Sequence, residues 1–307
     1  MNWKGVMPAI TTGFKPDLTV DLGFLQEHAR WLVDNGCTGI VCLGSLGEGA
    51  TLGREEKRRV LETTVKAVGN RVPVVSANSS LSTVEAVELA KEAAAVGCSA
   101  LMVLPPYVYK GDWREMKYHV SSVIGATQLS CMLYNNPVAY GTDFLPEQIA
   151  ELAAEHSNLH AVKESSTDAR RVTAIRALIG NRLEIFVGVD DAIVEGIAMG
   201  ATGWIAGLAN AFPRESVELY EAALRGDRDK AFDIYKWFLP MLRMDTVPKF
   251  VQLIKLAQAE VGMGSARVRP PRMEVVGAEL EQARSIIRQA LAHRPQSAKA
   301  STSLAAR

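Results

Sequence analysis

Short apolar segments alternate with longer amphipathic segments along most of this chain. A short apolar run bounded by turn residues is typical of a buried strand, and apolar residues spaced three or four apart are typical of a helix. We expect strands at Val6–Ile10, Gly39–Leu43, Val72–Ser76, Ala100–Leu104, Ser130–Tyr134, His160–Lys163, Glu184–Val187 and Gly203–Ala206. We expect helices between and after them, at Leu22–Asp34, Arg54–Val68, Thr83–Ala95, Trp113–Ile124, Pro146–Glu155, Ala169–Leu178, Ala192–Met199 and Arg214–Leu224.

Local signals at the ends of several segments support the helices. Ser82 stands immediately before the helix expected from Thr83, and Glu85 follows Ser82 by three residues, which is the spacing of a capping box. A left-handed residue that ends a helix is most often glycine. A glycine lies just past three of the helical segments, at Gly36, Gly97 and Gly200.

Eight strand–helix units in series predict an α/β fold of the TIM (β/α)8 barrel type. The strands are apolar nearly throughout, as in a parallel sheet that is covered on both faces, and such a sheet can close into a single barrel domain. A doubly wound open sheet is the alternative. It usually has fewer strands, and the first turn here, Thr11–Phe14, lacks the G-x-G-x-x-G pattern.

The pattern divides the chain into three parts. We expect the catalytic barrel at residues 1–225, followed by a C-terminal helical subdomain at residues 226–293. The helices of this extension are expected at Lys230–Leu242, Thr246–Val261 and Ala278–Leu291. Residues 294–307 are rich in serine and alanine with few large apolar side chains, so we expect a disordered tail.

Composition and charge exclude several classes of partner. Lysine and arginine together number 34, as do aspartate and glutamate, so nothing favours nucleic acid or an anionic membrane surface. No apolar run approaches the roughly 18 residues of a membrane span, and the N-terminus lacks the layout of a signal peptide. The four cysteines are scattered, and Cys42, Cys98 and Cys131 lie in or beside apolar runs. We therefore expect a cytoplasmic protein.

The histidines do not indicate a metal site. Their spacing contains neither H-x-x-H nor H-E-x-x-H, the patterns that place two ligands on one helix face. The five are His28, His119, His156, His160 and His293. We expect no metal ion and no other cofactor.

In a TIM barrel the active site lies at the C-terminal ends of the strands. This rule selects a few short segments of the chain. They are Gly44–Glu48 after the second strand, Tyr134–Pro137 after the fifth, Lys163–Ser166 after the sixth, Gly188–Asp191 after the seventh, and Gly207–Leu208 after the eighth.

Lys163 ends an apolar strand and is the outlier among these residues. A bare ammonium is costly over a barrel core, and desolvation lowers the pKa of a lysine until the neutral amine can attack a carbonyl. The alternative is a structural lysine that reaches the rim and pairs with Glu164 or Glu184. Lys163 is therefore a candidate for a Schiff-base nucleophile.

Tyr134 ends the neighbouring strand and can reach over the same space. A Schiff-base enzyme needs a general acid and base, which a tyrosine beside an amine can supply, although a core tyrosine with a satisfied hydroxyl is the plainer explanation. The Gly44–Glu48 turn offers backbone N–H groups suited to a carboxylate. Glu48 can instead cap or brace the following helix.

Taken together, these segments resemble one known family. The sequences GSLGE, YNNP, KESS and GVDD after strands two, five, six and seven, with RVRPP at Arg267–Pro271, are similar to the dihydrodipicolinate synthase / N-acetylneuraminate lyase family. The resemblance covers about residues 4 to 290. It implies a TIM barrel with C-terminal helices, a homotetramer built as a dimer of dimers, and a class I Schiff-base mechanism without a metal.

The resemblance also implies residue roles. Lys163 corresponds to the Schiff-base lysine and Tyr134 to the acid/base, while Ser45 with the amide of Leu46 corresponds to the turn that relays protons and binds a carboxylate. The residues expected to bind substrate are Gly44, Ser45, Leu46, Asn136, Tyr140, Gly188 and Gly207.

Three departures from the family pattern bear on the substrate. The synthase carries two threonines where this chain has Ser45 and Leu46, and an arginine that clamps a second carboxylate is replaced by Ala139. A charge-assisted contact to a carboxylate is worth about 1.5–3 kcal/mol. The tyrosine that the family supplies to a neighbouring subunit could be Tyr107 or Tyr109. The lysine-pathway reaction is therefore doubtful, and a compact hydroxylated 2-oxo or 2-imino acid fits better.

The runs YNNPxAYG and KESSxDxRR look most like members that deaminate 4-hydroxy-1-pyrroline-2-carboxylate. In that reaction Lys163 would transiminate the cyclic imine, the 4-hydroxyl would be eliminated, and hydrolysis would release ammonia and 2-oxoglutarate semialdehyde. The alternatives are a 2-keto-3-deoxy sugar-acid aldolase or dehydratase and a 4-hydroxy-tetrahydrodipicolinate synthase. A non-catalytic sensor that binds a 2-oxo acid is a further alternative, but the intact pair of Lys163 and Tyr134 argues against it.

Overall fold

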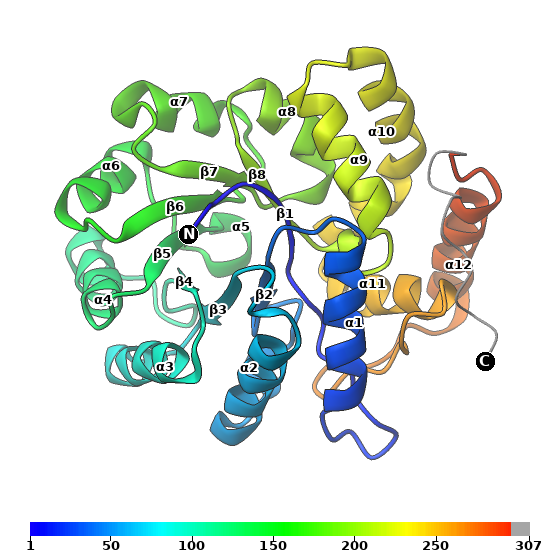
Figure 1. The fold of residues 1–307 in the computed structure, drawn as a ribbon, viewed down its shortest axis with the longest axis horizontal. Helices are drawn as coiled ribbons and strands as arrows, with labels where there is room; N and C mark the ends of the chain where they lie inside the picture. The colour runs from blue at the N-terminus through cyan, green and yellow to red at the C-terminus, as the bar shows by residue number, and fades with distance from the viewer. Residues whose placement is uncertain (296–307) are drawn as a thin grey trace.

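The structure is a computed structural model that describes residues 1–295. Its eight strands run parallel around a central axis, with helices packed outside them (Figure 1). The strands are β1 Gly5–Pro8, β2 Ile40–Cys42, β3 Val74–Asn78, β4 Ala100–Val103, β5 Ser130–Asn135, β6 Leu159–Glu164, β7 Glu184–Val187 and β8 Gly203–Ala206. The predicted TIM barrel is confirmed.

Helices follow every strand. The main helices of the barrel are α1 Leu22–Asp34, α2 Arg54–Val68, α3 Thr83–Val96, α4 Trp113–Gly125, α6 Pro146–Glu155, α7 Arg170–Ile179, α8 Ile193–Ala198 and α9 Pro213–Leu224. Shorter turns of helix are η1 Gly49–Thr51, α5 Pro137–Tyr140, η2 Asp190–Ala192 and η3 Leu208–Asn210. The C-terminal elements are α10 Arg228–Leu242, η4 Arg243–Thr246, α11 Phe250–Glu260 and α12 Gly277–Ala292.

The barrel closes between its first two strands. Hydrogen-bonded pairing runs continuously from β1 through β8 and back to β2. The remaining seam is joined by a parallel bridge between Ala9 and Val41, where the Ile10 N–H donates to the Val41 carbonyl at 2.9 Å. Large apolar side chains on both faces of the sheet, such as Phe186 on the inner face and Trp204 on the outer face, have no exposure to solvent.

The local signals at helix ends are largely as predicted. Gly36, Gly97 and Gly200 have φ of +95°, +93° and +104°, the left-handed conformation expected of them. Ser82 caps α3 by accepting a hydrogen bond from the Glu85 N–H. The reciprocal bond of a full capping box is absent from the described residues, because the Glu85 carboxylate accepts from the Ser80 hydroxyl instead.

The helix predicted at Thr246–Val261 is wrong at its start. The structure has the short turn η4, then an extended Val247 with φ −116° and ψ 160°, and α11 begins only at Phe250. Pro248 explains the break, because a residue before proline is driven out of the helical conformation. The interruption carries Asp245 and Pro248 onto the C-terminal face of the barrel, where they line the cavity described below.

The C-terminal helices lie along one side of the barrel (Figure 1). They are joined to it by ion pairs that reach back to the first barrel helices, including Lys255 with Glu48 and Arg269 with Glu56. Of the tail predicted at 294–307, Arg294 is bonded to Glu215, and residues 296–307 lie outside the described part of the chain. No helix within residues 1–295 has the length and apolar character needed to cross a membrane.

Candidate active site

A cavity of about 430 Å³ opens at the C-terminal ends of the strands. It is lined by every residue that the sequence nominated for catalysis or substrate binding, namely Gly44, Ser45, Leu46, Tyr134, Asn136, Tyr140, Lys163, Gly188 and Gly207. Its outer wall comes from α5 and from the segment between η4 and α11. This second contribution, from Asp245, Thr246, Val247, Pro248 and Phe250, was not predicted.

Lys163 and Tyr134 face each other inside this cavity. They are register partners on β6 and β5, so their side chains point to the same side of the sheet. The Lys163 Nζ lies 3.9 Å from the centroid of the Tyr134 ring, and each residue is only 6% exposed. The amine is thus held against an aromatic face and within reach of a phenol.

The ion pairs considered for Lys163 do not form. Glu164 alternates to the outer face of β6, where it accepts from the Asn135 amide at 3.0 Å and from the Ser166 N–H at 2.7 Å. Glu184 accepts from the Thr202 hydroxyl at 2.5 Å. Burial therefore lowers the pKa of Lys163, an effect that the surrounding Tyr140, Asp245 and Asp190 only partly oppose. A larger share of neutral, nucleophilic amine is the result.

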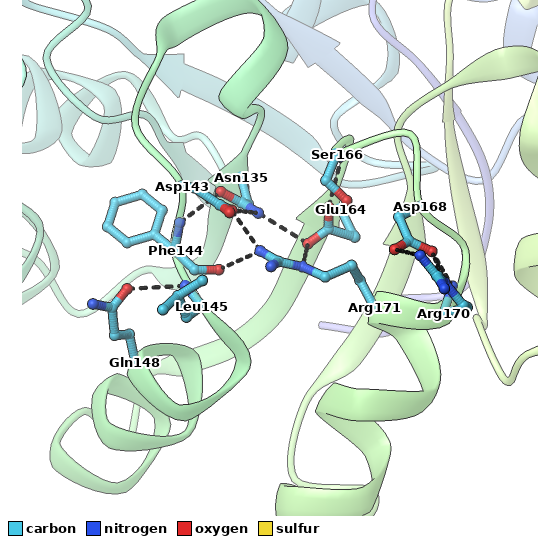
Figure 2. A network of polar contacts seen from close by, with 10 residues as sticks. All are labelled: Asn135, Asp143, Phe144, Leu145, Gln148, Glu164, Ser166, Asp168, Arg170 and Arg171. Carbon is cyan, nitrogen blue, oxygen red and sulfur yellow. Dashed lines mark hydrogen bonds and ion pairs between the residues drawn. The ribbon is translucent and has the colours of Figure 1, made fainter.

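A polar network behind the cavity fixes the ends of β5 and β6 (Figure 2). The side-chain amide of Asn135 donates to both Glu164 and Asp143. The Oδ1 atom of the same side chain accepts from the Phe144 N–H at 2.9 Å. Arg171 donates to Asp143 at 2.5 Å and to the Phe144 carbonyl at 2.9 Å. Because Asn135 and Glu164 directly follow Tyr134 and Lys163, the network holds the two inward-facing residues in place.

Three hydroxyl groups form a polar chain from Tyr134 towards β2. The Asn136 amide donates to the Tyr134 hydroxyl at 3.0 Å, and the Tyr140 and Ser45 hydroxyls are hydrogen-bonded to each other. The rings of Tyr134 and Tyr140 meet edge to face with centroids 5.5 Å apart. Burial raises the pKa of both phenols, while the contacts with Asn136 and Tyr140 act to lower that of Tyr134. This chain can pass a proton between the barrel interior and the β2 turn.

The helical turn α5 places Tyr140 over the cavity. Asn136 caps it by accepting from the Ala139 N–H at 2.9 Å, Pro137 occupies its first turn, and Gly141 ends it with φ +71°. The order Asn, Pro, Gly is the usual signature of such a turn. The element was missed in the sequence because four residues are too few to show helical periodicity.

The turn after β2 leaves donors free for an anion. Glu48 has φ +53°, and a Cβ on Gly49 would overlap the Leu43 carbonyl, so the chain must fold back tightly there. The described residues offer the N–H groups of Ser45 and Leu46 no hydrogen-bond acceptor. Both N–H groups lie beside the cavity, which makes this turn suited to a carboxylate.

Glu48 braces a different part of the molecule from the one expected. It makes no side-chain cap to the following helix. Its carboxylate, which is fully buried, accepts from Lys255 Nζ of α11 at 2.5 Å and from the Arg269 N–H at 3.0 Å. The turn after β2 is thereby tied to the C-terminal helices.

Glycines at the ends of β7 and β8 leave room in the cavity for Lys163 and for the carboxyl group of Asp245 from η4. A Cβ on Gly188 would come within 2.5 Å of the Lys163 Cε, and a Cβ on Gly207 would overlap the Asp245 carboxylate. Asp190 accepts from the N–H groups of Gly207 and Leu208 at 3.0 and 2.7 Å, and burial raises its pKa to about 6. Among the described lining residues, Lys163 is the only base and Asp245 the only carboxylic acid.

The two tyrosines after β4 differ in position. The Tyr107 ring lies 6.2 Å from that of Tyr140, next to the polar chain. Tyr109 is exposed and donates to Glu115, away from the cavity. Ala139, at the position of the family's arginine, lines the mouth of the cavity.

Residues 1–295 contain no group of three or more histidine, cysteine, aspartate and glutamate side chains placed to hold a metal ion. His160 lies on the surface at the opposite end of β6 and contacts the Ser130 hydroxyl at 2.7 Å. All four cysteines are buried free thiols, and burial raises their pKa values. The functional groups of the described cavity lining are one amine, two phenols, several aliphatic hydroxyls, an amide and one carboxyl group.

Comparison with known proteins places the chain among close relatives. A sequence model described as the dihydrodipicolinate synthetase family matches residues 2–290. The 4-hydroxy-tetrahydrodipicolinate synthase of Methanocaldococcus jannaschii is 33% identical over 89% of this chain and 93% of its own length. The enzyme of the same name from Agrobacterium fabrum is 33% identical, over 92% and 96%.

Solved structures give the same picture. A crystal structure of a putative dihydrodipicolinate synthetase from Pseudomonas aeruginosa superposes with a TM-score of 0.90, at 31% identity over 94% of this chain and 100% of that one. A prophage protein of this family from E. coli K12, crystallised in complex with pyruvate, has a TM-score of 0.88 at 26% identity, covering 94% and 99%.

Proposed function

The chain belongs to the dihydrodipicolinate synthetase family, whose members are class I lyases that work through a lysine Schiff base, and from this premise we propose that it dehydrates and deaminates 4-hydroxy-1-pyrroline-2-carboxylate. The products are 2-oxoglutarate semialdehyde and ammonia. The observation that carries the proposal is the charge of the cavity. Its described lining has one base, Lys163, and a carboxyl group rather than a cation at the mouth. A substrate with a single carboxylate fits this arrangement.

Each step of the reaction falls to a residue of the cavity. The substrate carboxylate accepts hydrogen bonds from the N–H groups of Ser45 and Leu46. The neutral Lys163 amine attacks C2 of the cyclic imine, and the ring nitrogen leaves as a primary amine on C5, so that Lys163 now holds the imine. Tyr134 takes a proton from C3, which gives an enamine. The enamine expels the hydroxyl of C4 and leaves a C3–C4 double bond. Proton transfers then move this double bond to C5 and its nitrogen, and hydrolysis of the imines at C2 and C5 releases both products.

In this scheme Asn136 holds the Tyr134 hydroxyl in position, and Tyr140 relays protons. Asn136 donates to the Tyr134 oxygen, which stabilises the phenolate that forms when the phenol loses its proton. Tyr140 connects Tyr134 with Ser45, so a proton can travel along three hydroxyl groups of one chain. Tyr140 thus takes the place of the tyrosine that a neighbouring subunit is expected to supply in the family.

We expect Tyr140→Phe to slow proton exchange at C3 by about 10²-fold, because general acid–base groups contribute on this order. The measurement is deuterium uptake from solvent into the methyl group of pyruvate. Trapping of the pyruvate adduct with borohydride should remain intact, since Lys163 is untouched. Tyr118→Phe, which changes an exposed tyrosine of α4 outside the cavity lining, is the matched control and should exchange at the wild-type rate. Wild-type exchange in Tyr140→Phe would remove the relay from the scheme.

The second candidate is 4-hydroxy-tetrahydrodipicolinate synthesis, which the names of the curated relatives favour. That reaction joins pyruvate to aspartate semialdehyde and brings a second carboxylate to the mouth. In this chain the mouth offers it Ala139, Tyr140 and Asp245, none of which is a cation. Loss of a charge-assisted contact costs about 1.5–3 kcal/mol of binding.

A direct comparison of the two reactions tests the proposal. We expect the wild type to release ammonia from 4-hydroxy-1-pyrroline-2-carboxylate at least about 10²-fold faster, as kcat/KM, than it condenses pyruvate with aspartate semialdehyde, in line with several kcal/mol of lost binding. Ala139→Arg should slow deamination by crowding and charging the mouth. Efficient condensation without ammonia release would replace the deaminase by the synthase and leave the Schiff-base barrel in place.

The same assays distinguish two further candidate functions, a sugar-acid aldolase or dehydratase and a sensor. A 2-keto-3-deoxy sugar-acid aldolase would release pyruvate and an aldehyde from its substrate, and a dehydratase acting on such acids would release neither ammonia nor pyruvate. A sensor that only binds a 2-oxo acid has no need of a reducible adduct. Burial lowers the pKa of Lys163, and the larger share of neutral amine favours a Schiff base with a 2-oxo acid. This argues against a sensor that only binds its ligand.

An exposed apolar surface and the buried cysteine thiols support a proposal for the oligomeric state and the cellular compartment. Exposed apolar side chains at Leu81, Tyr109 and Tyr118 line one groove over α3 and α4, with Val84 and Val108 exposed in the same segments. We propose that this surface is covered in a homotetramer, a dimer of dimers, whose mass light scattering will report. The four buried free thiols fit the reducing cytoplasm, where we place the protein.

A further inference from the structure

Asp245 occupies a place in the cavity that the steps above leave without a task. It lies in η4, directly before the break at Pro248, and its carboxylate packs against Gly207 at the end of β8. Within the described residues it makes no hydrogen bond and no ion pair. An unpaired carboxyl group facing a substrate cavity is costly, so a contact with a bound molecule is the expected compensation.

The surroundings of Asp245 favour its protonated form. Burial raises the pKa of its carboxyl group well above the usual value, the charge of Asp190 raises it further, and Lys163 opposes the shift. Asp190 cannot take the same part. Its oxygens already accept from the N–H groups of Trp204, Gly207 and Leu208, and it lies outside the lining. The raised pKa favours the protonated form of Asp245, and its place in the lining puts this carboxyl group beside the cavity.

The path of the substrate leads past this group. With the carboxylate of C1 at the Ser45–Leu46 turn and C2 bonded to Lys163, the remaining carbons extend towards the mouth. The cavity lining includes the segment from Asp245 to Pro248 as well as α5. Tyr134, the base for C3, belongs to β5, whereas Asp245 belongs to η4, so the proton that leaves C3 and the group that leaves C4 can meet different residues.

We propose that Asp245 is the general acid that protonates the hydroxyl leaving C4, a catalytic role that rests on the proposed function and completes its elimination step. In the enamine, the nitrogen lone pair of Lys163 re-forms the C2–N double bond, and the C2–C3 pair becomes the C3–C4 double bond. The C4–O bond breaks with its electrons on oxygen. That oxygen takes the Asp245 proton and departs as water.

The charges balance across this step. The Lys163 nitrogen becomes a cationic iminium as Asp245 becomes a carboxylate, so each new charge stabilises the other in a poorly solvated cavity. Solvent returns the proton to Asp245 when the products leave. The elimination releases one water, and hydrolysis of the two imines consumes two, which leaves a net uptake of one water per turnover.

The test compares leaving groups in Asp245→Asn, a variant of nearly the same shape that cannot act as an acid. We expect ammonia release from 4-hydroxy-1-pyrroline-2-carboxylate to fall by about 10²- to 10⁴-fold. The 4-chloro analogue of the same ring loses chloride, which needs no proton, so its elimination should stay within about threefold of the wild type. The wild-type kcat should decline as pH rises through the Asp245 pKa, and this decline should vanish in the variant.

Two internal measurements separate chemistry from structure. The borohydride adduct with pyruvate and the deuterium exchange at C3 should survive Asp245→Asn, because neither step uses the acid. Asp233→Asn removes an exposed carboxylate of α10 that pairs with Lys236 outside the cavity lining, and it should behave as the wild type.

Three other outcomes would each contradict the acid role of Asp245. If Asp245→Asn releases ammonia from the hydroxy substrate at the wild-type rate, the inference is wrong while the proposed function stands. Equal losses with the hydroxy and chloro substrates overturn it too, since they indicate a positioning role. If the wild type releases no ammonia from the hydroxy substrate, the proposed function fails, and the acid role fails with it.

Discussion

Lys163→Ala is expected to lose both the covalent chemistry and the activity. Wild-type enzyme treated with borohydride and pyruvate should gain a stable adduct on the peptide that contains Lys163, and the variant should gain none. Turnover should fall by on the order of 10⁴-fold or more, because loss of a covalent nucleophile removes the whole pathway rather than one contact. Mass spectrometry of the reduced protein and an ammonia assay measure the two effects.

A second buried lysine provides an internal comparison. Lys255 is as well shielded as Lys163, and burial lowers its pKa too, but its amine is held by Glu48 and lies outside the cavity lining, so it should remain unlabelled in the wild type. Lys163→Arg keeps a positive charge without a nucleophile and should be as inactive as the alanine variant. A reducible adduct retained in Lys163→Ala would contradict the assignment of the Schiff base.

Glu48→Gln is expected to lower the free energy of unfolding by about 3–5 kcal/mol, the usual cost of leaving one partner of a buried ion pair without its counter-charge. Glu48 is 0% and Lys255 2% exposed, and Arg269 and Arg272 add further positive charge around the same carboxylate. Chemical denaturation monitored by fluorescence measures the change. The turn that presents Ser45 should also loosen, so KM should rise.

A surface pair offers the matched control for this experiment. Glu55 binds Arg58 on the exposed face of α2, where water already solvates both groups, so Glu55→Gln should leave stability unchanged. The double variant Glu48→Gln with Lys255→Met should recover part of the lost stability, because it removes the stranded charge. Equal stability of Glu48→Gln and the wild type would show that the buried pair contributes nothing to the fold.

The fold was predictable from the sequence because a parallel barrel repeats one local pattern eight times. Each strand is a short apolar run between amphipathic helices, so errors at strand ends, such as the shift of β3 to Val74–Asn78, leave the architecture unchanged. Lys163 and Tyr134 could be brought together for the same reason. Adjacent parallel strands end at the same face, and these residues end neighbouring strands.

The features that the sequence did not reveal depend on distant contacts or on single residues. Apolar periodicity continues across Pro248, which hid the break that delivers Asp245 to the cavity. Nothing near Asp245 in the chain indicates that it packs against Gly207. Glu48 looked like a local brace because its true partner, Lys255, lies 207 residues further along the chain. The bond between Ser45 and Tyr140 likewise joins separate loops.

The pairing of Glu48 with Lys255 sets an order of events during synthesis. The turn after β2 leaves the ribosome early, but its counter-charge lies 207 residues further on. At roughly 5–20 residues per second, a nascent chain therefore carries the acid unmatched for about 10 to 40 seconds. A product that terminates before Lys255 could complete all eight strands and still lack an anchored turn. We therefore expect catalytic competence only after α11 has been synthesised.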